Sequence, residues 1–116
     1  MLKKRDRLTT KEIESLSRPG QGKSVHGALF SLRFSPSVRA KLSVSVSKKV
    51  AARAVDRNRL RRRVYAAAEA TIGGAKRSGQ PAFVLLMPKK ECASLPFDRL
   101  GAEIGAIFQK AGLFHQ

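Results

Sequence analysis

The fold is decided by residues 41–63, KLSVSVSKKVAARAVDRNRLRRR, where a two-residue repeat gives way to a helical one. In residues 41–47 leucine and valine alternate with serine, which is the pattern of a half-buried strand. From about residue 56 to 72 the apolar residues recur at helical spacing, with Asp56 as the expected N-cap and Gly73-Gly74 as the stop. This segment therefore predicts a strand that leads into a long helix.

Shorter elements flank this segment on both sides. A helix is predicted at residues 10–17, and an alternating strand at 28–34 that places Phe30, Leu32 and Phe34 on one face. Residues 82–87 are apolar on both faces, which is typical of a strand inside a sheet. Pro96 opens a closing helix in which Phe97, Leu100, Ile104, Ile107, Phe108 and Ala111 are in register.

These elements predict an α+β fold of order α-β-β-α-β-α, with a short additional strand near residues 24–26. Strands 28–34 and 41–47 are expected to form an antiparallel pair with one apolar and one polar face. A length of 116 residues fits one domain, residues 1–116, in which residues 1–9 form a basic and flexible N-terminal segment.

The net charge of +16 indicates a polyanionic partner, since self-repulsion of this size opposes the compact state. Residues 1–63 carry 18 Lys/Arg and 4 Asp/Glu, a net charge of +14, whereas residues 64–116 carry 6 and 4, a net charge of +2. A charge that served solubility alone would be spread more evenly. Nucleic acid is the favoured partner, ahead of an anionic membrane or another protein.

Eight of the sixteen residues from Lys48 to Arg63 are basic. With Leu60 at the centre of the buried stripe, the arginines fan over the whole exposed side of the first two helical turns. They repel one another and lie at the helix end where the macrodipole disfavours cations, as expected of a binding site that sacrifices local stability. The alternative is an ordinary solvated basic face, which the density of arginine and the lack of interleaved glutamate disfavour.

The serine face of strand 41–47 is a second candidate surface. Ser43, Ser45 and Ser47 share parity with Lys49, which suits an extended single strand of RNA, although a plain solvent-exposed sheet face explains the pattern equally well. Tyr65 is expected on the exposed flank of the helix, where it either stacks on a base or covers surface.

No catalytic or metal site can be assembled from the sequence. The single cysteine, Cys92, excludes an internal disulfide, and His26 and His115 have no ligand at metal spacing. The eight acidic residues are scattered, whereas a two-metal nuclease needs converging carboxylates. No apolar run approaches the roughly 20 residues that span a bilayer, and no secretory signal is evident.

A resemblance to a known family rests on three motifs. Residues 45–50, SVSKKV, the pair Ala54-Val55, and residues 57–62, RNRLRR, resemble the signature of the bacterial ribonuclease P protein component. Residues 2–8, LKKRDRL, are similar to that family's opening. The resemblance implies a fold of the ribosomal-protein-S5-domain-2-like type, with a left-handed β-α-β crossover through the arginine-rich helix.

The resemblance also implies roles for individual residues. The RNA-subunit-binding residues would be Lys48, Lys49, Arg53, Arg57, Asn58, Arg59, Arg61, Arg62 and Arg63. A cleft between the sheet and the first helix would hold the 5′ leader of precursor tRNA, and its residues would be Ser31, Arg33, Ser43, Ser45 and Ser47. Family members carry aromatic residues in this cleft; here the first helix offers Ile13, Leu16 and Ser17, and Arg33 takes the place of a tyrosine.

The implied function is that of the protein subunit of ribonuclease P, a cytoplasmic ribonucleoprotein endonuclease that removes the 5′ leader of precursor tRNA. The catalytic RNA and precursor tRNA are the expected partners, without a membrane or an obligate protein partner. The RNA performs the hydrolysis, Mg²⁺ is expected in the holoenzyme, and the protein's side chains alone bind no cofactor. The alternatives are a structural RNA-binding protein of ribosomal type and a free-standing nuclease.

Overall fold

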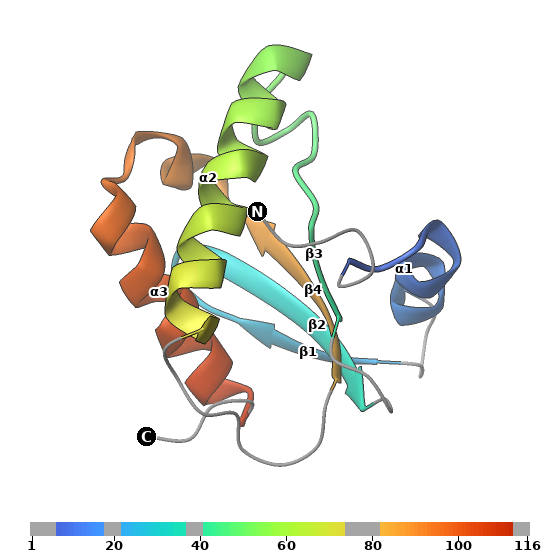
Figure 1. The fold of residues 1–116 in the computed structure, drawn as a ribbon. Coiled ribbons are helices and arrows are strands. Elements are labelled where there is room, and N and C mark those ends of the chain that lie inside the picture. Colours follow the sequence, from blue (N-terminus) through green and yellow to red (C-terminus); the bar gives the residue numbers. More distant parts are fainter. Residues whose placement is uncertain (1–6, 18–21, 37–40, 74–81, 113–116) are drawn as a thin grey trace.

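The computed structural model describes residues 7–17, 22–36, 41–73 and 82–112. Its described elements form one four-stranded sheet, of order β1-β2-β4-β3, with helices on both sides (Figure 1). The first helix has its predicted bounds, and the short strand expected near residues 24–26 is present. The elements are α1 (Thr10–Ser17), β1 (Lys23–His26), β2 (Phe30–Pro36), β3 (Lys41–Val44), α2 (Ala54–Gly73), β4 (Ala82–Pro88), the 3₁₀ helix η2 (Lys90–Ser94) and α3 (Phe97–Lys110).

Strand β4 lies inside the sheet, between β2 and β3. It pairs antiparallel with β2, from Phe30↔Pro88 to Pro36↔Ala82, and parallel with β3. The prediction that β2 and β3 pair with each other is therefore wrong, whereas the interior position predicted for β4 is confirmed. The physical reason is that a strand apolar on both faces must be covered on both, and in the interior of the sheet α2 and α3 cover one face while α1 and Leu8 cover the other.

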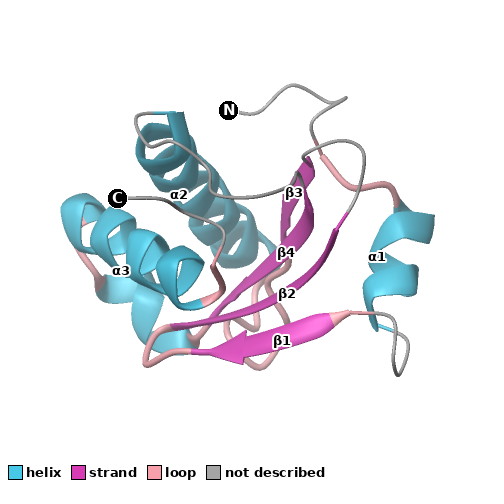
Figure 2. Ribbon diagram, turned by 90° about the horizontal axis from the view of Figure 1, so that it is seen from below, coloured by secondary structure: helices cyan, strands magenta, loops and turns pink. Residues whose placement is uncertain are grey.

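Helices cover the two faces of the sheet unequally (Figure 2). Helices α2 and α3 pack on one face and enclose the main core, where Val64 and Leu86 are fully buried. Helix α1 covers part of the other face, where Leu8 and Leu16 pack on Leu85. Strand β4 thus supplies Leu86 to one core and Leu85 to the other, so its two apolar faces hold the layers together.

The β3–α2–β4 segment is the predicted crossover. In Figure 1, β3 and β4 both run upward, α2 passes in front of the sheet, and β4 lies to the left of β3. This arrangement is left-handed, as the resemblance implied, against the right-handed rule for β-α-β units. The crossover carries the arginine-rich start of α2 to the end of the sheet where β3 ends.

Helix α2 begins at Ala54, two residues before the predicted N-cap. The Arg57 N–H donates to the Arg53 carbonyl at 3.0 Å, so the helical hydrogen bonds start there. Asp56 lies in the first turn instead, 3.6 Å from the Arg53 guanidinium. The N-cap prediction is therefore wrong, although a carboxylate in the first turn still favours the helix through the macrodipole.

Helix α3 departs from its predicted register at its first residue. Leu100, Ile104, Ile107 and Phe108 are buried as predicted. Phe97, one turn before the first of these, is 49% exposed and does not belong to the core.

Hydrogen bonds from distant segments cover β3 at its outer edge and on the face toward α1. The Val44 N–H donates to the Tyr65 hydroxyl at 3.1 Å, and the Leu8 N–H donates to the Ser43 Oγ at 2.9 Å. Tyr65 is buried, which corrects its predicted exposure, and the Arg7 guanidinium lies 5.1 Å from the centre of its ring. Since an unpaired strand edge is a site for unwanted pairing, the Tyr65 hydroxyl protects β3.

Replacing Tyr65 with phenylalanine should lower the free energy of unfolding by about 1–2 kcal/mol. The substitution keeps the buried ring but leaves the Val44 N–H without its acceptor. Urea denaturation followed by circular dichroism measures the change, with Ala66→Ser at an exposed position of the same helix as the control. A Tyr65→Phe protein as stable as the parent would show that the hydroxyl does not secure the edge of β3.

Candidate nucleic-acid interface

The residues predicted to bind the RNA subunit, all of them basic except Asn58, gather at the start of α2 and on the turn before it. We call this set the docking surface; its members are Lys48, Lys49, Arg53, Arg57, Asn58, Arg59, Arg61, Arg62 and Arg63. The turn is held by the Ser47 carbonyl, which accepts the Val50 N–H at 3.1 Å and the Ala51 N–H at 3.2 Å. It leaves Lys48 and Lys49 exposed beside the helix.

Part of the docking surface is engaged within the protein. Arg57 donates to the carbonyls of Ala51 at 3.1 Å and Ala52 at 2.7 Å, and so holds the turn against the helix. Arg63 donates to the carbonyls of Ala93, in η2, and Leu95, just after it, and so ties α2 to this part of the chain. These two arginines shape the surface as well as charging it.

Another pair of docking residues interacts along the helix. The Arg61 guanidinium donates to the Asn58 Oδ1 at 2.7 Å. The bond orients the planar guanidinium along the helix, which suits bidentate contact with a phosphate.

The remaining basic residues project toward solvent. Lys48, Lys49, Arg59 and Arg62 are exposed, and none makes a hydrogen bond or ion pair with another residue that the structure describes. Arg53 has a side chain that is 76% exposed and pairs only loosely with Asp56. These guanidinium and ammonium groups repel one another at the positive end of the helix dipole, so an anion at this surface would relieve a local cost.

The second candidate surface is the sheet face that carries α1. Arg33 donates from Nε to the Leu16 carbonyl at 2.7 Å and from Nη1 to the Ser24 Oγ at 2.8 Å. It therefore anchors the end of α1 to the sheet. Beside it, the Ser31 Oγ lies 3.1 Å from the His26 Nδ1.

The serines predicted for the leader cleft do not form one row. Ser43 is buried and its hydroxyl is taken by the Leu8 N–H, so the prediction that it lines an open cleft is wrong. Ser45 and Ser47 are exposed but lie beyond β3, which ends at Val44 instead of Ser47. The reason is the insertion of β4, which separates β2 from β3, and the cover that residues 7 and 8 place over β3.

Phe83 and Met87 of β4 lie on the same face, where the sequence analysis did not place them. Met87 is the register partner of Ser31, and both apolar side chains pack beside α1 while keeping some exposure. Lys41 lies 5.8 Å from the centre of the Phe83 ring and pairs with Glu12 at 3.1 Å. The two-sided apolar pattern of β4 was the signal that could have identified them.

Glu12 belongs to the cap that positions α1 over this face. The Thr9 N–H donates to the Glu12 Oε1 at 2.7 Å, and the Glu12 N–H donates to the Thr9 Oγ1 at 3.2 Å, which is a capping box. The Thr9 backbone hydrogen bond first, and Lys41 after it, hold the pKa of Glu12 below its ordinary value against the opposing effect of burial.

The described residues bring together no group of three His, Cys, Asp or Glu side chains that could hold a metal ion. Cys92 is buried, and its thiol donates to the Leu29 carbonyl at 3.0 Å. Burial raises the pKa of this thiol, which makes it a poor nucleophile. No helix within the described ranges is long and apolar enough to cross a membrane.

The fold is shared with solved bacterial structures. A Staphylococcus aureus RNase P protein is 16% identical with a TM-score of 0.75, over 95% of this chain and 98% of that one. An RNase P protein from Thermotoga maritima is 18% identical with a TM-score of 0.73, over 90% of this chain and 96% of that one. No curated protein sequence matches the chain.

The sequence also matches a family model described as Ribonuclease P, over residues 2–112. The match includes both candidate surfaces and every described element. The chain belongs to the Ribonuclease P family.

Proposed function

We propose that the chain binds the catalytic RNA of ribonuclease P through the docking surface and the 5′ leader of precursor tRNA through the sheet face beside α1. The exposed arginines at the start of α2 carry the proposal. They occupy the end of the helix where cations are least favoured, and a bound polyanion would offset the part of that cost that Asp56 and the backbone carbonyls leave. Membership of the family supports an RNA of ribonuclease P as that polyanion.

The docking surface suits a folded RNA with closely spaced phosphates. Arg59 and Arg62 provide mobile cations, while Arg57 and Arg63 are held by backbone carbonyls and keep a fixed spacing. The combination of fixed and mobile guanidinium groups supports recognition of a defined backbone shape. A structural RNA-binding protein of ribosomal type remains the alternative function for such a surface, and the family match disfavours it.

The sheet face beside α1 suits an extended strand of few nucleotides. Ser31 and Arg33 supply polar contacts, and Met87 and Phe83 supply an apolar floor. Phe83 is partly covered by Lys41, so base stacking here is limited and the contact is largely polar. We therefore propose that the leader cleft consists of Ser31, Arg33, Ser45 and the two β4 side chains, with His26 at its end.

The chemistry of cleavage is assigned to the RNA subunit. The acidic side chains near the two surfaces are Asp56 in α2 and Glu12 and Glu14 in α1, and no three His, Cys, Asp or Glu side chains of the described residues come together. A Mg²⁺ ion in the holoenzyme would then be held by RNA phosphates, and the protein would contribute affinity, orientation and charge compensation. We place the holoenzyme in the cytoplasm, together with precursor tRNA.

Reconstitution tests the proposal. The chain is combined with a bacterial ribonuclease P RNA and precursor tRNA at low magnesium, and cleavage is followed on a gel. We expect cleavage at the 5′ end of the mature sequence only when both protein and RNA are present. Cleavage by the protein alone would assign the chemistry to the chain, and a lack of stimulation would favour the structural RNA-binding function.

Reversing two exposed charges of the docking surface should weaken binding to the catalytic RNA. Arg59→Glu with Arg62→Glu is expected to lower affinity at least about tenfold. With ~6 phosphate contacts, the parent should show a slope of log affinity against log salt on the order of −4 to −5, and the variant a slope about two units shallower. Filter binding across a salt series measures both quantities, with Lys11→Glu on α1 as the matched control. An unchanged slope would remove these arginines from the interface.

A carboxylate introduced on the sheet face beside α1 should weaken binding of the leader without affecting binding of the rest of the tRNA. Ser31→Glu is expected to weaken binding of leader-bearing tRNA to the holoenzyme about fivefold or more, with binding of mature tRNA unchanged. Ala102→Glu, on an exposed part of α3, serves as the control. Equal losses for both tRNAs would place the leader elsewhere.

A further inference from the structure

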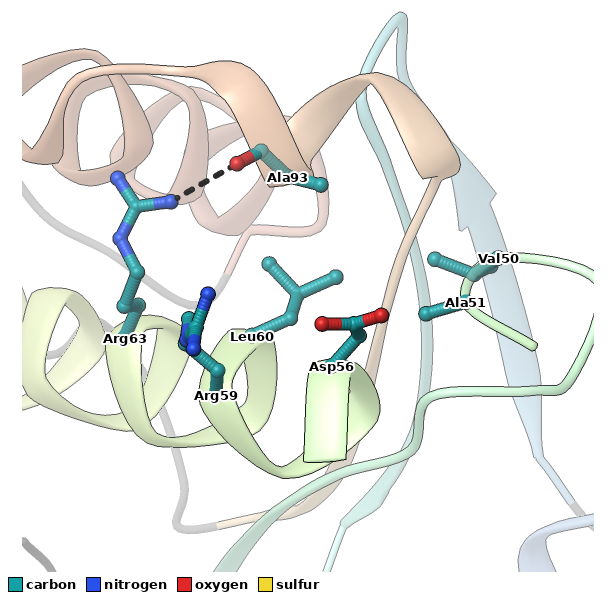
Figure 3. A pocket seen from close by; sticks show the side chains of 7 residues that line it. All are labelled: Val50, Ala51, Asp56, Arg59, Leu60, Arg63 and Ala93. Carbon is teal, nitrogen blue, oxygen red and sulfur yellow. Dashed lines mark hydrogen bonds between the residues drawn. The ribbon is translucent and has the colours of Figure 1, made fainter. Parts of the chain in front are cut away.

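A half-open pocket of about 280 Å³ lies on the flank of α2 that faces η2 (Figure 3). Its floor is apolar, and its rim carries one carboxylate and two guanidinium groups. Figure 3 shows its lining: Val50, Ala51, Asp56, Arg59, Leu60, Arg63 and Ala93. The pocket lies within the docking surface, so whatever enters it belongs to the partner bound there.

The size and lining of the pocket suit one flat ring system. Pockets for drug-sized ligands span roughly 300–1,000 Å³, and this one lies just below that range. Leu60 is buried at the floor, and the backbone turn at Val50 and Ala51 forms one wall. An unstacked nucleobase has the required shape, with a planar apolar body and a polar edge.

Two arginines form the sides of the pocket, and they differ in whether hydrogen bonds hold their guanidinium groups in place. Arg63 is fixed by its hydrogen bonds to the Ala93 and Leu95 carbonyls, so it forms a permanent wall. Arg59 makes no hydrogen bond or ion pair with another described residue, and in Figure 3 its guanidinium stands beside Leu60. A guanidinium plane free to move over an apolar floor can stack on a base that enters.

Asp56 is the feature that a phosphate-binding surface does not explain. It is the one acidic residue between Lys41 and Arg63, and it lines the pocket, with a side chain 43% exposed. Its place in the first turn of α2, beside Arg53, favours the helix, but a carboxylate at this point also repels the phosphates of a bound RNA. An ionised carboxylate accepts hydrogen bonds and donates none, which suits an edge with adjacent N–H donors.

We propose that this pocket holds an unpaired guanine base of the catalytic RNA, with Asp56 accepting from guanine N1–H and N2–H and with Arg59 stacking on the ring. Among the four bases, guanine alone presents two adjacent donors on its Watson–Crick edge. Adenine and cytosine each place a ring acceptor beside their single amino group, and uracil flanks its one donor with two carbonyls. The inference rests on the proposed function, because it takes the docking surface as the site of the RNA subunit.

The direction in which Asp56→Asn changes the affinity for the catalytic RNA distinguishes recognition of a base from simple charge repulsion. If Asp56 only repels phosphates, Asp56→Asn removes a negative charge and binding of the catalytic RNA becomes tighter. If Asp56 reads a guanine, Asp56→Asn weakens binding about fivefold or more, with the salt slope unchanged. Asp98→Asn is the matched control, since Asp98 is also an exposed acid in the first turn of a helix, away from the pocket.

Chemical probing of the RNA identifies the base. A glyoxal reagent that modifies guanine at N1 and N2 should react with at least one guanine in the free RNA, and that position should be protected by the parent protein and by Asp98→Asn. Asp56→Asn should leave it reactive. Replacing that guanine with inosine, which lacks the N2 amino group, should weaken binding of the parent and leave binding of Asp56→Asn unchanged.

Three results would overturn the pocket assignment while leaving the proposed function intact: tighter binding by Asp56→Asn, no guanine protected by the parent, or the same protection with Asp56→Asn. A parent protein that fails to bind the RNA at all would instead refute the proposed function. Circular dichroism of each variant confirms that α2 is retained, so loss of the helix is not mistaken for loss of the base contact.

Discussion

Strand β4 is apolar on both faces, and the rest of the architecture depends on covering both of them. Leu86 points into the core under α2 and α3, and Leu85 points into the smaller core under α1. Neither face can be left to water without losing apolar burial, and in the interior of the sheet, between β2 and β3, helices cover both of them. That position makes β3–α2–β4 a parallel crossover and carries the start of α2 to one end of the sheet.

The start of α2 combines two demands that oppose each other. A helix N-terminus favours anions, yet this one is surrounded by guanidinium groups. The protein relieves part of the conflict internally, since Arg57 and Arg63 each bind two backbone carbonyls. Arg59 and Arg62 are left exposed, and in the proposed function an RNA partner relieves the remainder. Arginines that bind backbone carbonyls and arginines that remain exposed thus lie side by side in one set of like charges, which serves the structure and suits the proposed binding.

The sequence patterns predicted the helices and strands well, but predicted poorly which of them lie next to one another. The bounds of α1 and the apolar parity of β2 and β4 were readable, because burial follows the period of each element. The pairing of β2 with β3 was wrong, because a strand inserted from later in the chain leaves no mark on either sequence. The predicted exposure of Ser43 and of Tyr65 was wrong because of contacts with distant segments. Leu8 covers Ser43, and β3 covers Tyr65.

The sequence by itself determined the fold class, the apolar faces, and the concentration of positive charge at one helix entrance. These properties reside in the order of residues along single elements, where periodicity and charge density act locally. The tertiary structure decided which arginines remain free, which serines reach solvent, and where Asp56 meets an apolar pocket. Those outcomes depend on contacts between segments far apart in the chain, and such contacts are set by how the layers pack.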